Sequence, residues 1–302
     1  MRRRTITLLL LILVGAAAVW ILPHYYSPAM GPAVQVGDQR PFVVFDGTLF
    51  KNKPSLVPHH VRPITLLYES RLFVANQSAD AVPPEAIVRS LAHELRSSPE
   101  PAVLDIERWP LTGDGLTVQS TVGKFLSVLS WAKGEAPNVR FGLYGTVPVP
   151  DYWRAIRDPV SEEFRSWQQD NDRLEAVSDR VDALFPSIYT FYPDRQGWVT
   201  YAIAQIAEAR RKAKGKPVYA FLWPQYHESN RLLGLQPLDP DYWELQLNTA
   251  AQHADGLVIW GGWGANGPEP WNEEAPWWQV TKRFMKRLEP AAPSTPSALQ
   301  VK

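Results

Sequence analysis

Two acidic residues end an apolar run in the stretch Pro101-Ala102-Val103-Leu104-Asp105-Ile106-Glu107-Arg108-Trp109-Pro110. Residues i and i+2 of a β-strand point to the same side, so a strand that includes Asp105 and Glu107 would project both carboxylates together. Like charges held this close resist joint ionisation, which raises the pKa of one of them. Such a carboxyl can donate a proton near neutral pH, as cleavage of a glycosidic bond requires. The alternative is a strand-end pair that caps a helix or binds a nearby arginine.

The stretch 102–107 is one of seven short apolar runs that alternate with helical patterns. The other runs are 41–46, 64–68, 139–144, 183–189, 218–222 and 256–260, and helical patterns span 84–96, 118–133 and 199–214. The runs are continuously apolar, as expected of strands covered on both faces. Repeated β-then-α order predicts parallel strands with right-handed crossovers. Seven such strands favour an α/β fold of the TIM-like (β/α) barrel type over an open sheet.

The chain of 302 residues divides by composition into four parts. Three arginines followed by an apolar run predict a signal peptide or an uncleaved signal anchor over 1–22. A linker over 23–40, a barrel over 41–288 and a disordered Pro/Ala/Ser-rich tail over 289–302 follow. Either form of the leader predicts export to the periplasm or the cell exterior. If the leader is kept, residues 6–22 anchor the protein in the membrane with the arginines inside.

Composition excludes several classes of protein. The balance of 31 basic and 31 acidic residues disfavours a nucleic-acid binder. The absence of cysteine excludes disulfides, thiolate metal sites and thiol nucleophiles. No histidine pair has the spacing of a zinc protease, no Gly-x-Ser-x-Gly elbow occurs, and no Gly-rich phosphate loop follows a strand. Thirteen Trp and eleven Tyr are typical of carbohydrate sites, although a large barrel also buries many aromatic residues.

Active sites of such barrels lie at the carboxyl ends of the strands. Besides the two carboxylates, this rule nominates aromatic residues at or just after later strand ends: Tyr144, Tyr189, Trp223, Tyr226, Trp260 and Trp263. Two carboxylates ringed by tyrosine and tryptophan are typical of a sugar site rather than a metal site. Asp46 is expected to cap a turn, and His227 to lie at the surface.

These motifs resemble the hyaluronidases, glycoside hydrolase family 56. The family's catalytic strand, an apolar run with Asp-x-Glu and a Trp-Arg-Pro-like segment, is similar to 104–110. The run 183–189, Ala-Leu-Phe-Pro-Ser-Ile-Tyr, is similar to a specific Pro-Ser-Ile-Tyr block of the family. Further similar blocks are 64–72, 141–145, 217–226 and 254–261. The blocks follow the family order and cover most of 42–285.

The resemblance implies a distorted barrel of seven strands and a retaining, substrate-assisted endo-glycosidase. In that mechanism the acetamido oxygen of the substrate attacks the anomeric carbon. Glu107 is then the acid and later the base, while Asp105 and Tyr189 hold the acetamido group. Substrate-binding roles are expected for Tyr226, Trp260, Tyr144 and Trp263. No metal or organic cofactor is implied, and a monomer that acts on a polysaccharide is expected.

The chain also departs from the family. Animal hyaluronidases carry disulfides, and Arg108-Trp109-Pro110 follows Glu107 directly where the family has Glu-x-Trp-Arg-Pro. The residues that recognise glucuronate are not carried over, so the expected substrate class is an N-acetylhexosamine-containing polysaccharide. A polyanionic substrate would call for a basic, elongated groove. Two alternatives remain: a non-catalytic carbohydrate-binding or assembly protein of an envelope polysaccharide system, and a barrel hydrolase that cleaves peptidoglycan.

Overall fold

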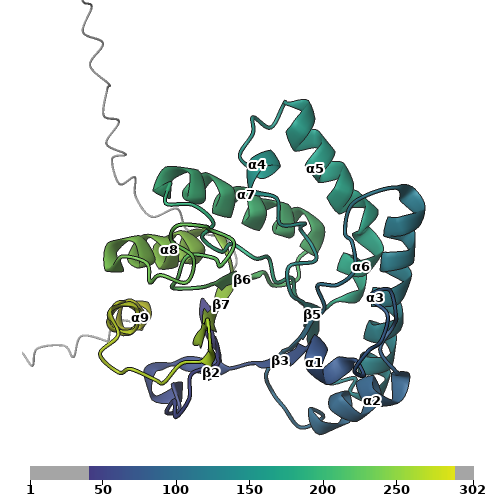
Figure 1. Ribbon diagram of the computed structural model, residues 1–302, viewed down its shortest axis with the longest axis horizontal. Coiled ribbons are helices and arrows are strands. Elements are labelled where there is room, and N and C mark those ends of the chain that lie inside the picture. The colour runs from purple at the N-terminus through teal and green to yellow at the C-terminus, as the bar shows by residue number, and fades with distance from the viewer. Residues whose placement is uncertain (1–40, 290–302) are drawn as a thin grey trace, which may run out of the picture. The chain divides into compact units, whose positions relative to one another are not determined.

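The computed structural model describes residues 41–289, whose strands are arranged in a ring with helices outside it (Figure 1). The predicted leader, the linker and the tail beyond Glu289 lie outside the described residues. The strands that pair in parallel are β1 (Val43–Thr48), β2 (Val61–Pro63), β3 (Thr65–Tyr68), β4 (Ala102–Asp105), β5 (Phe141–Leu143), β6 (Tyr219–Leu222) and β7 (Gly256–Gly261). A two-stranded antiparallel hairpin, β8 (Trp263–Gly264) and β9 (Gly267–Pro268), follows β7.

The strands form two sheets that together close a barrel. One sheet has the order β2-β1-β7-β6 and the other the order β3-β4-β5. The chain passes from the first sheet to the second at Ile64, between β2 and β3. Residues 184–190 close the opposite side through isolated parallel bridges to Tyr144 and to the β6 region. We call each strand position around the barrel a stave. With β2 and β3 counted as one stave and residues 184–190 as another, the described residues form the predicted distorted barrel of seven staves.

The predicted strand 183–189 is paired but not regular, and Pro186 is the reason. Leu184 donates its N–H to Pro217 O at 2.9 Å, and Ile188 donates to Phe221 O at 3.1 Å. A regular parallel ladder would include a donor halfway between them, at residue 186. Proline has no N–H, so the ladder loses that bond and reduces to isolated bridges.

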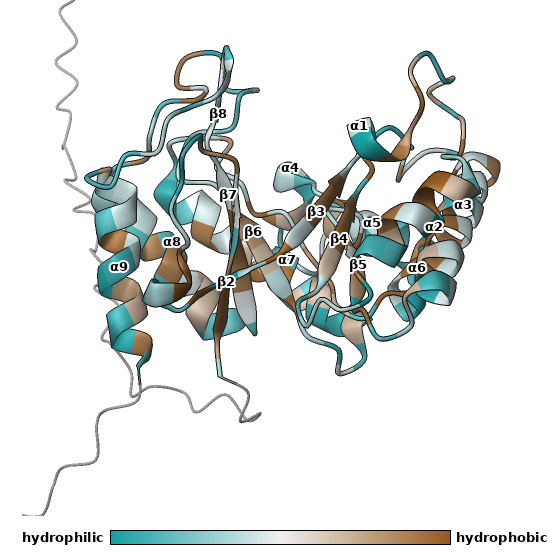
Figure 2. Cartoon of the chain, turned by 90° about the horizontal axis from the view of Figure 1, so that it is seen from below, coloured by the Kyte–Doolittle hydropathy of each residue, from teal (hydrophilic) through white to brown (hydrophobic). Residues whose placement is uncertain are grey.

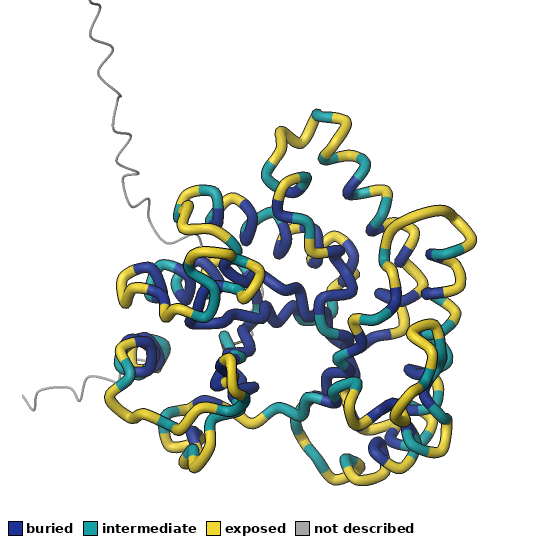
Figure 3. Tube along the Cα trace, viewed as in Figure 1, coloured by how far each residue is buried: buried dark blue, intermediate teal, exposed yellow. Residues whose placement is uncertain are grey.

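Apolar side chains on the two faces of the staves pack into two clusters, which explains the continuous apolar runs. The interior cluster consists of Phe45, Val103, Ala183, Phe185, Tyr189, Tyr219, Phe221, Trp223 and Val258. Their strand neighbours, such as Val44, Leu104 and Leu257, pack in the larger cluster with the helices. Strands such as β4 are largely hydrophobic in Figure 2, and most of the strand ring is buried in Figure 3, whereas its β2–β3 side is intermediate or exposed.

Helices cover the outside of the staves (Figure 1). The longer ones are α2 (Glu85–Glu94), α3 (Gly115–Glu135), α5 (Glu162–Arg173), α7 (Arg195–Ala213), α8 (Pro240–His253) and α9 (Pro276–Leu288). The shorter ones are η1 (Val57–His59), α1 (Glu69–Leu72), α4 (Tyr152–Ala155) and α6 (Glu175–Arg180). The predicted helices 84–96, 118–133 and 199–214 are confirmed as α2, α3 and α7. Within residues 41–289, no helix combines the length and apolar character that crossing a membrane requires.

Gly142 in β5 leaves room for an interior ring, and we expect its replacement to destabilise the barrel. An added Cβ would lie 2.3 Å from the Phe185 ring and 2.9 Å from the carbonyl oxygen of Ala183. Gly142→Ala should therefore lower the free energy of unfolding by roughly 1–3 kcal/mol. Gly123→Ala is the control, because Gly123 faces open space in α3, and there alanine should add about 0.5–1 kcal/mol. Denaturant unfolding of both variants measures the difference, and equal stabilities would contradict the account.

Candidate functional site

Asp105 and Glu107 lie at the carboxyl-terminal edge of the barrel. The strand β4 ends at Asp105, Ile106 and Glu107 continue without a turn, and the chain turns at Arg108 and Trp109. Ile106 between them is buried in the larger apolar cluster, whereas Asp105 is half-buried and Glu107 exposed. Both carboxylates line the same two hollows of the surface. Leu104 and Ile106 pack in the larger apolar cluster, so the alternation of β4 continues past its end and places the two carboxylates on one side, as the sequence predicted.

Glu69, the first residue of α1, fixes this turn. Its Oε1 accepts the backbone N–H groups of Glu107 and Arg108, each at 2.8 Å. Its Oε2 accepts a hydrogen bond from Arg108 Nε, also at 2.8 Å. The guanidinium of Arg108 lies 3.7 Å from the centre of the Phe73 ring. One carboxylate therefore replaces the ladder bonds that a longer β4 would supply, and it positions Glu107 without touching the Glu107 side chain.

Glu107 lines three adjoining hollows, which we call together the groove. The main hollow, of about 780 Å³, has walls that include Asp105, Tyr144, Tyr189, Trp223, Trp260 and Trp263. The distal hollow, of about 360 Å³, extends past Tyr144 and Tyr189 to Val149, Pro150 and Phe191. The side hollow, of about 460 Å³, is lined by Tyr68, Glu69, Ser70, Asp105, Glu107 and Arg108. Glu107 thus stands where the three hollows meet, whereas Asp105 lines the main and side hollows but not the distal one.

Aromatic rings pack edge to face along the main hollow. The ring of Trp223 lies 4.7 Å from that of Trp260 and 5.6 Å from that of Tyr189, measured between centres. Trp260 Nε1 donates a hydrogen bond to the hydroxyl of Tyr68 at 3.0 Å, and Tyr144 donates to Ser187 Oγ at 3.1 Å. These bonds fix the polar tips of the rings while leaving apolar faces along the wall. Flat faces with polar edges match the two-sided chemistry of a sugar ring.

Both carboxyls have raised pKa values. Burial, then the charges of Glu107 and Glu69, raises the pKa of Asp105 from 3.8 to about 7. Partial burial, then the charges of Glu69 and Glu228, raises the pKa of Glu107. A carboxyl that keeps its proton toward neutral pH can act as a general acid, and a neighbour that ionises nearby can stabilise positive charge. The sequence predicted a raised pKa from mutual repulsion. The pKa of Asp105 is raised, but burial is the larger cause. The charges that raise the pKa of Glu107 are those of Glu69 and Glu228.

The structure brings together most of the residues nominated from the sequence. Tyr144, Tyr189, Trp260 and Trp263 line the main hollow with the two carboxylates. Tyr226 does not line any of the three hollows and packs instead in the larger apolar cluster. Pairing of Gln225 with Pro237 turns the chain after β6, so that Trp223 and His227 reach the groove instead of Tyr226. The substrate-binding role predicted for Tyr226 is therefore not supported by its position.

Sequence reasoning missed several residues of the groove. Tyr68 ends β3, so the strand-end rule that nominated Tyr144 could have found it. The side chain of His227, expected at the surface, is half-buried in the groove, where burial lowers its pKa. Glu69 and Glu228 lie after strand ends, but no local pattern marks carboxylates that act on a residue distant in sequence. Asp46, expected to cap a turn, accepts from Thr48 N at 3.0 Å and pairs with Lys53.

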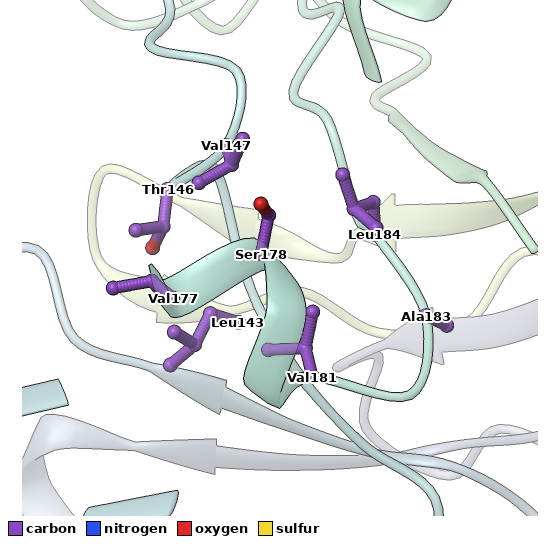
Figure 4. A pocket seen from close by; sticks show the side chains of 8 residues that line it. All are labelled: Leu143, Thr146, Val147, Val177, Ser178, Val181, Ala183 and Leu184. Carbon is purple, nitrogen blue, oxygen red and sulfur yellow. The ribbon is translucent and has the colours of Figure 1, made fainter. Parts of the chain in front are cut away.

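A separate small cavity lies between α6 and the neighbouring staves (Figure 4). Its volume is about 10 Å³, which is room for one water molecule at most. The side chains around it are Leu143, Thr146, Val147, Val177, Ser178, Val181, Ala183 and Leu184. It is a packing defect that cannot admit a sugar, so the groove is the candidate site. Among residues 41–289, no cluster of three or more His, Asp or Glu side chains is arranged to hold a metal ion.

The fold is shared with solved glycoside hydrolase structures. Bee venom hyaluronidase is similar with 17% identity and a TM-score of 0.55, over 82% of this chain and 96% of that one. The same enzyme in complex with a hyaluronic acid tetramer gives 16% identity and a TM-score of 0.53. An endo-β-1,4-mannanase double mutant of Cellulomonas fimi gives 12% identity and a TM-score of 0.50, over 76% of this chain and 55% of that one. No protein-family model matches the chain, and no curated protein matches its sequence. At these identities, the chain has the barrel fold of these hydrolases.

Proposed function

We propose that the chain is a retaining, substrate-assisted endo-glycosidase that hydrolyses an N-acetylhexosamine-containing polysaccharide. The observation that supports this function best is the placement of Asp105 and Glu107. Two carboxyls with raised pKa values share an aromatic groove at the carboxyl-terminal edge of a barrel. Such barrels hold their active sites at that edge. The blocks that resemble the hyaluronidases supply the substrate class and the type of mechanism.

Glu107 is the proton carrier in this proposal. It stands at the junction of the main and distal hollows, so a polymer that occupies both would pass its linking oxygen beside Glu107. The protonated carboxyl donates its proton to that oxygen as the glycosidic bond breaks. The resulting carboxylate then takes a proton from the water that opens the cyclic intermediate. A groove that continues on both sides of the acid supports cleavage within a chain.

Asp105 lies deeper and faces the main hollow, where the sugar on the cleaved side would sit. In a substrate-assisted reaction the acetamido oxygen bonds to the anomeric carbon, and positive charge develops on the acetamido group. An ionised Asp105 stabilises that charge and orients the N–H. The hydroxyl of Tyr189, whose ring packs against Trp223 and Trp260, is the proposed donor to the same group. The predicted leader over 1–22 makes export, with or without a membrane anchor, part of the proposal.

Product analysis tests the proposal. The protein is incubated with hyaluronan, chondroitin, chitin oligomers and peptidoglycan, and new reducing ends are measured. We expect a reducing-end N-acetylhexosamine from one of these polymers, released first as the anomer of the same configuration as the cleaved bond. Binding of a glycan without new reducing ends would sink the enzyme assignment and favour the carbohydrate-binding alternative. Release of reducing ends from peptidoglycan alone would favour the alternative of a barrel hydrolase that cleaves peptidoglycan.

Glu69 offers a test of the turn that positions Glu107. In Glu69→Gln an amide oxygen can still accept the two backbone N–H groups, but one of the two charges that, after burial, raise the pKa of Glu107 is gone. The alkaline limb of the pH–kcat profile should therefore move to lower pH. Glu69→Ala also loses the acceptor, and the loosened turn should lower kcat by about tenfold or more. The two pH profiles separate charge from position, and profiles identical to the wild type would contradict both roles.

A further inference from the structure

The groove is acidic, although the chain as a whole is neutral. Four carboxylates line its three hollows: Glu69, Asp105, Glu107 and Glu228. Within residues 41–289, the one lysine or arginine whose side chain lines these hollows is Arg108, and it lies in the side hollow. The basic, elongated groove expected for a polyanionic substrate is therefore not what these residues form. The net charge of zero in the sequence conceals an uneven distribution.

Arg108 is already engaged by its neighbours. Its Nε donates to Glu69 at 2.8 Å, and its guanidinium stacks over Phe73. Its Nη1 is buried away from the surface, where a ligand cannot reach it. His227, the other basic group of the groove, has its pKa lowered by burial and is neutral at pH 7. Neither group offers a free positive charge to a carboxylate or sulfate of a substrate.

Hydrogen bonds hold the backbone turn that carries Glu228 at the main hollow. It follows His227, whose backbone N–H donates to Thr190 O at 2.8 Å. Asn230 anchors the same turn, because its Nδ2 donates to Phe191 O at 2.8 Å and its Oδ1 accepts from Leu233 N at 2.9 Å. The turn thus presents an exposed carboxylate into the groove beside His227. Its charge contributes to the raised pKa of Glu107, which places it within electrostatic range of the acid.

We propose that the groove selects an uncharged N-acetylhexosamine polymer and rejects polymers that carry uronate or sulfate groups, with Glu228 as a specificity-determining residue. The inference rests on the proposed function, since it specifies the substrate of that site. A uronate polymer carries one carboxylate in each disaccharide, so a bound segment would hold anions beside the carboxylate of Glu228 and, as pH rises through about 7, beside an ionised Asp105. Like charges opposed in a partly desolvated groove repel strongly, and repulsive elements of this kind reject wrong ligands. An uncharged chain meets the same aromatic walls without that penalty.

The test compares chitin oligomers with hyaluronan oligomers of matched length. For the wild-type protein, we expect kcat/KM on the chitin oligomer to exceed that on the hyaluronan oligomer at least tenfold at low salt. Added salt should narrow the ratio, because it screens the repulsion. Glu228→Gln should narrow the ratio severalfold, and Glu228→Lys should narrow it further. The ratio removes any change in the pKa of Glu107 that affects both substrates alike.

Glu163→Gln is the matched control, since Glu163 is exposed on α5 and lines none of the hollows. It should leave the ratio at the wild-type value. A hyaluronan preference in the wild type, or a ratio that Glu228→Gln does not move, would overturn the inference while leaving the glycosidase proposal intact. The proposed function fails only if none of the four polymers of the product analysis is cleaved, and calorimetric binding of the chitin and hyaluronan oligomers then still tests the charge selectivity by itself.

Discussion

Glu107→Gln is expected to lower kcat by at least about a hundredfold on the polymer that the wild-type protein cleaves. General acid catalysis contributes about 10²–10⁴ to such rates, and an amide cannot deliver the proton that the leaving oxygen needs. The backbone N–H of residue 107 still bonds to Glu69, so the turn and the groove keep their shape. KM should change little, because the side chain is neutral in both the protonated glutamic acid and the glutamine. Steady-state release of reducing ends measures both constants.

A substrate with an activated leaving group provides the control for Glu107. In an aryl or fluoride glycoside of N-acetylhexosamine, the aryloxide or fluoride leaves without being protonated. The first reaction step, which forms the cyclic intermediate, should therefore survive in Glu107→Gln. The later hydrolysis step, for which Glu107 acts as the base, should then limit turnover. A burst of the leaving group followed by a slow phase is the expected time course. Full turnover of the natural polymer by Glu107→Gln would show that another group is the acid.

Asp105→Asn is expected to lower activity by about a hundredfold and yet to stabilise the fold at alkaline pH. Burial raises the pKa of Asp105 from 3.8 to about 7, so the folded state binds the proton more tightly than the unfolded state. Stability contributed by that proton is present at low pH and is lost as pH rises toward 7. Above pH 7 the ionised carboxyl destabilises the fold by about 4 kcal/mol, and asparagine removes that charge. The loss of activity follows because asparagine cannot stabilise the charge on the acetamido group.

Thermal unfolding at two pH values checks the stability of Asp105→Asn. At pH 8 the Tm of the variant should exceed that of the wild type by several degrees. Near pH 4 the two Tm values should converge, because the wild-type carboxyl is then protonated in the folded state. Glu163→Gln removes an exposed carboxylate and should show no such pH-dependent gain. A variant less stable than the wild type at pH 8 would indicate that burial is not the source of the raised pKa.

The barrel and its active edge were predictable because their signals are local. Each apolar run is the length of a buried strand, and the rule for strand ends then locates Asp105 and Tyr144 without knowledge of the fold in detail. The exception is 183–190, where Pro186 removes a rung that no apolar pattern can restore. Its pairing was therefore predictable from the apolar pattern, whereas its irregularity comes from the N–H that Pro186 lacks.

What the sequence could not reveal depends on contacts between distant segments. Glu107 is held by Glu69, which precedes it by 38 residues. The displacement of Tyr226 by Trp223 and His227 follows from the pairing of Gln225 with Pro237. The acidity of the groove is likewise a property of arrangement, since the same residues dispersed over the surface would give the same net charge. Local patterns can predict which strand ends surround the site, but the charge of the groove and the exact residues that line it depend on how distant segments pack.

The seams at Ile64 and Pro186 divide the barrel into two half-shells, one holding β3-β4-β5 and the other β6-β7-β1-β2. The candidate acids belong to the first half-shell, whereas Trp223 and Trp260 belong to or follow strands of the second. Backbone hydrogen bonds between residues 184–190 and residues 217–227 join the half-shells on one side, so the relative position of acid and aromatic wall depends on these bonds as well as on the regular ladders. A glycan bound in the groove would contact both half-shells, so the bound substrate would itself add contacts that hold the two half-shells in position.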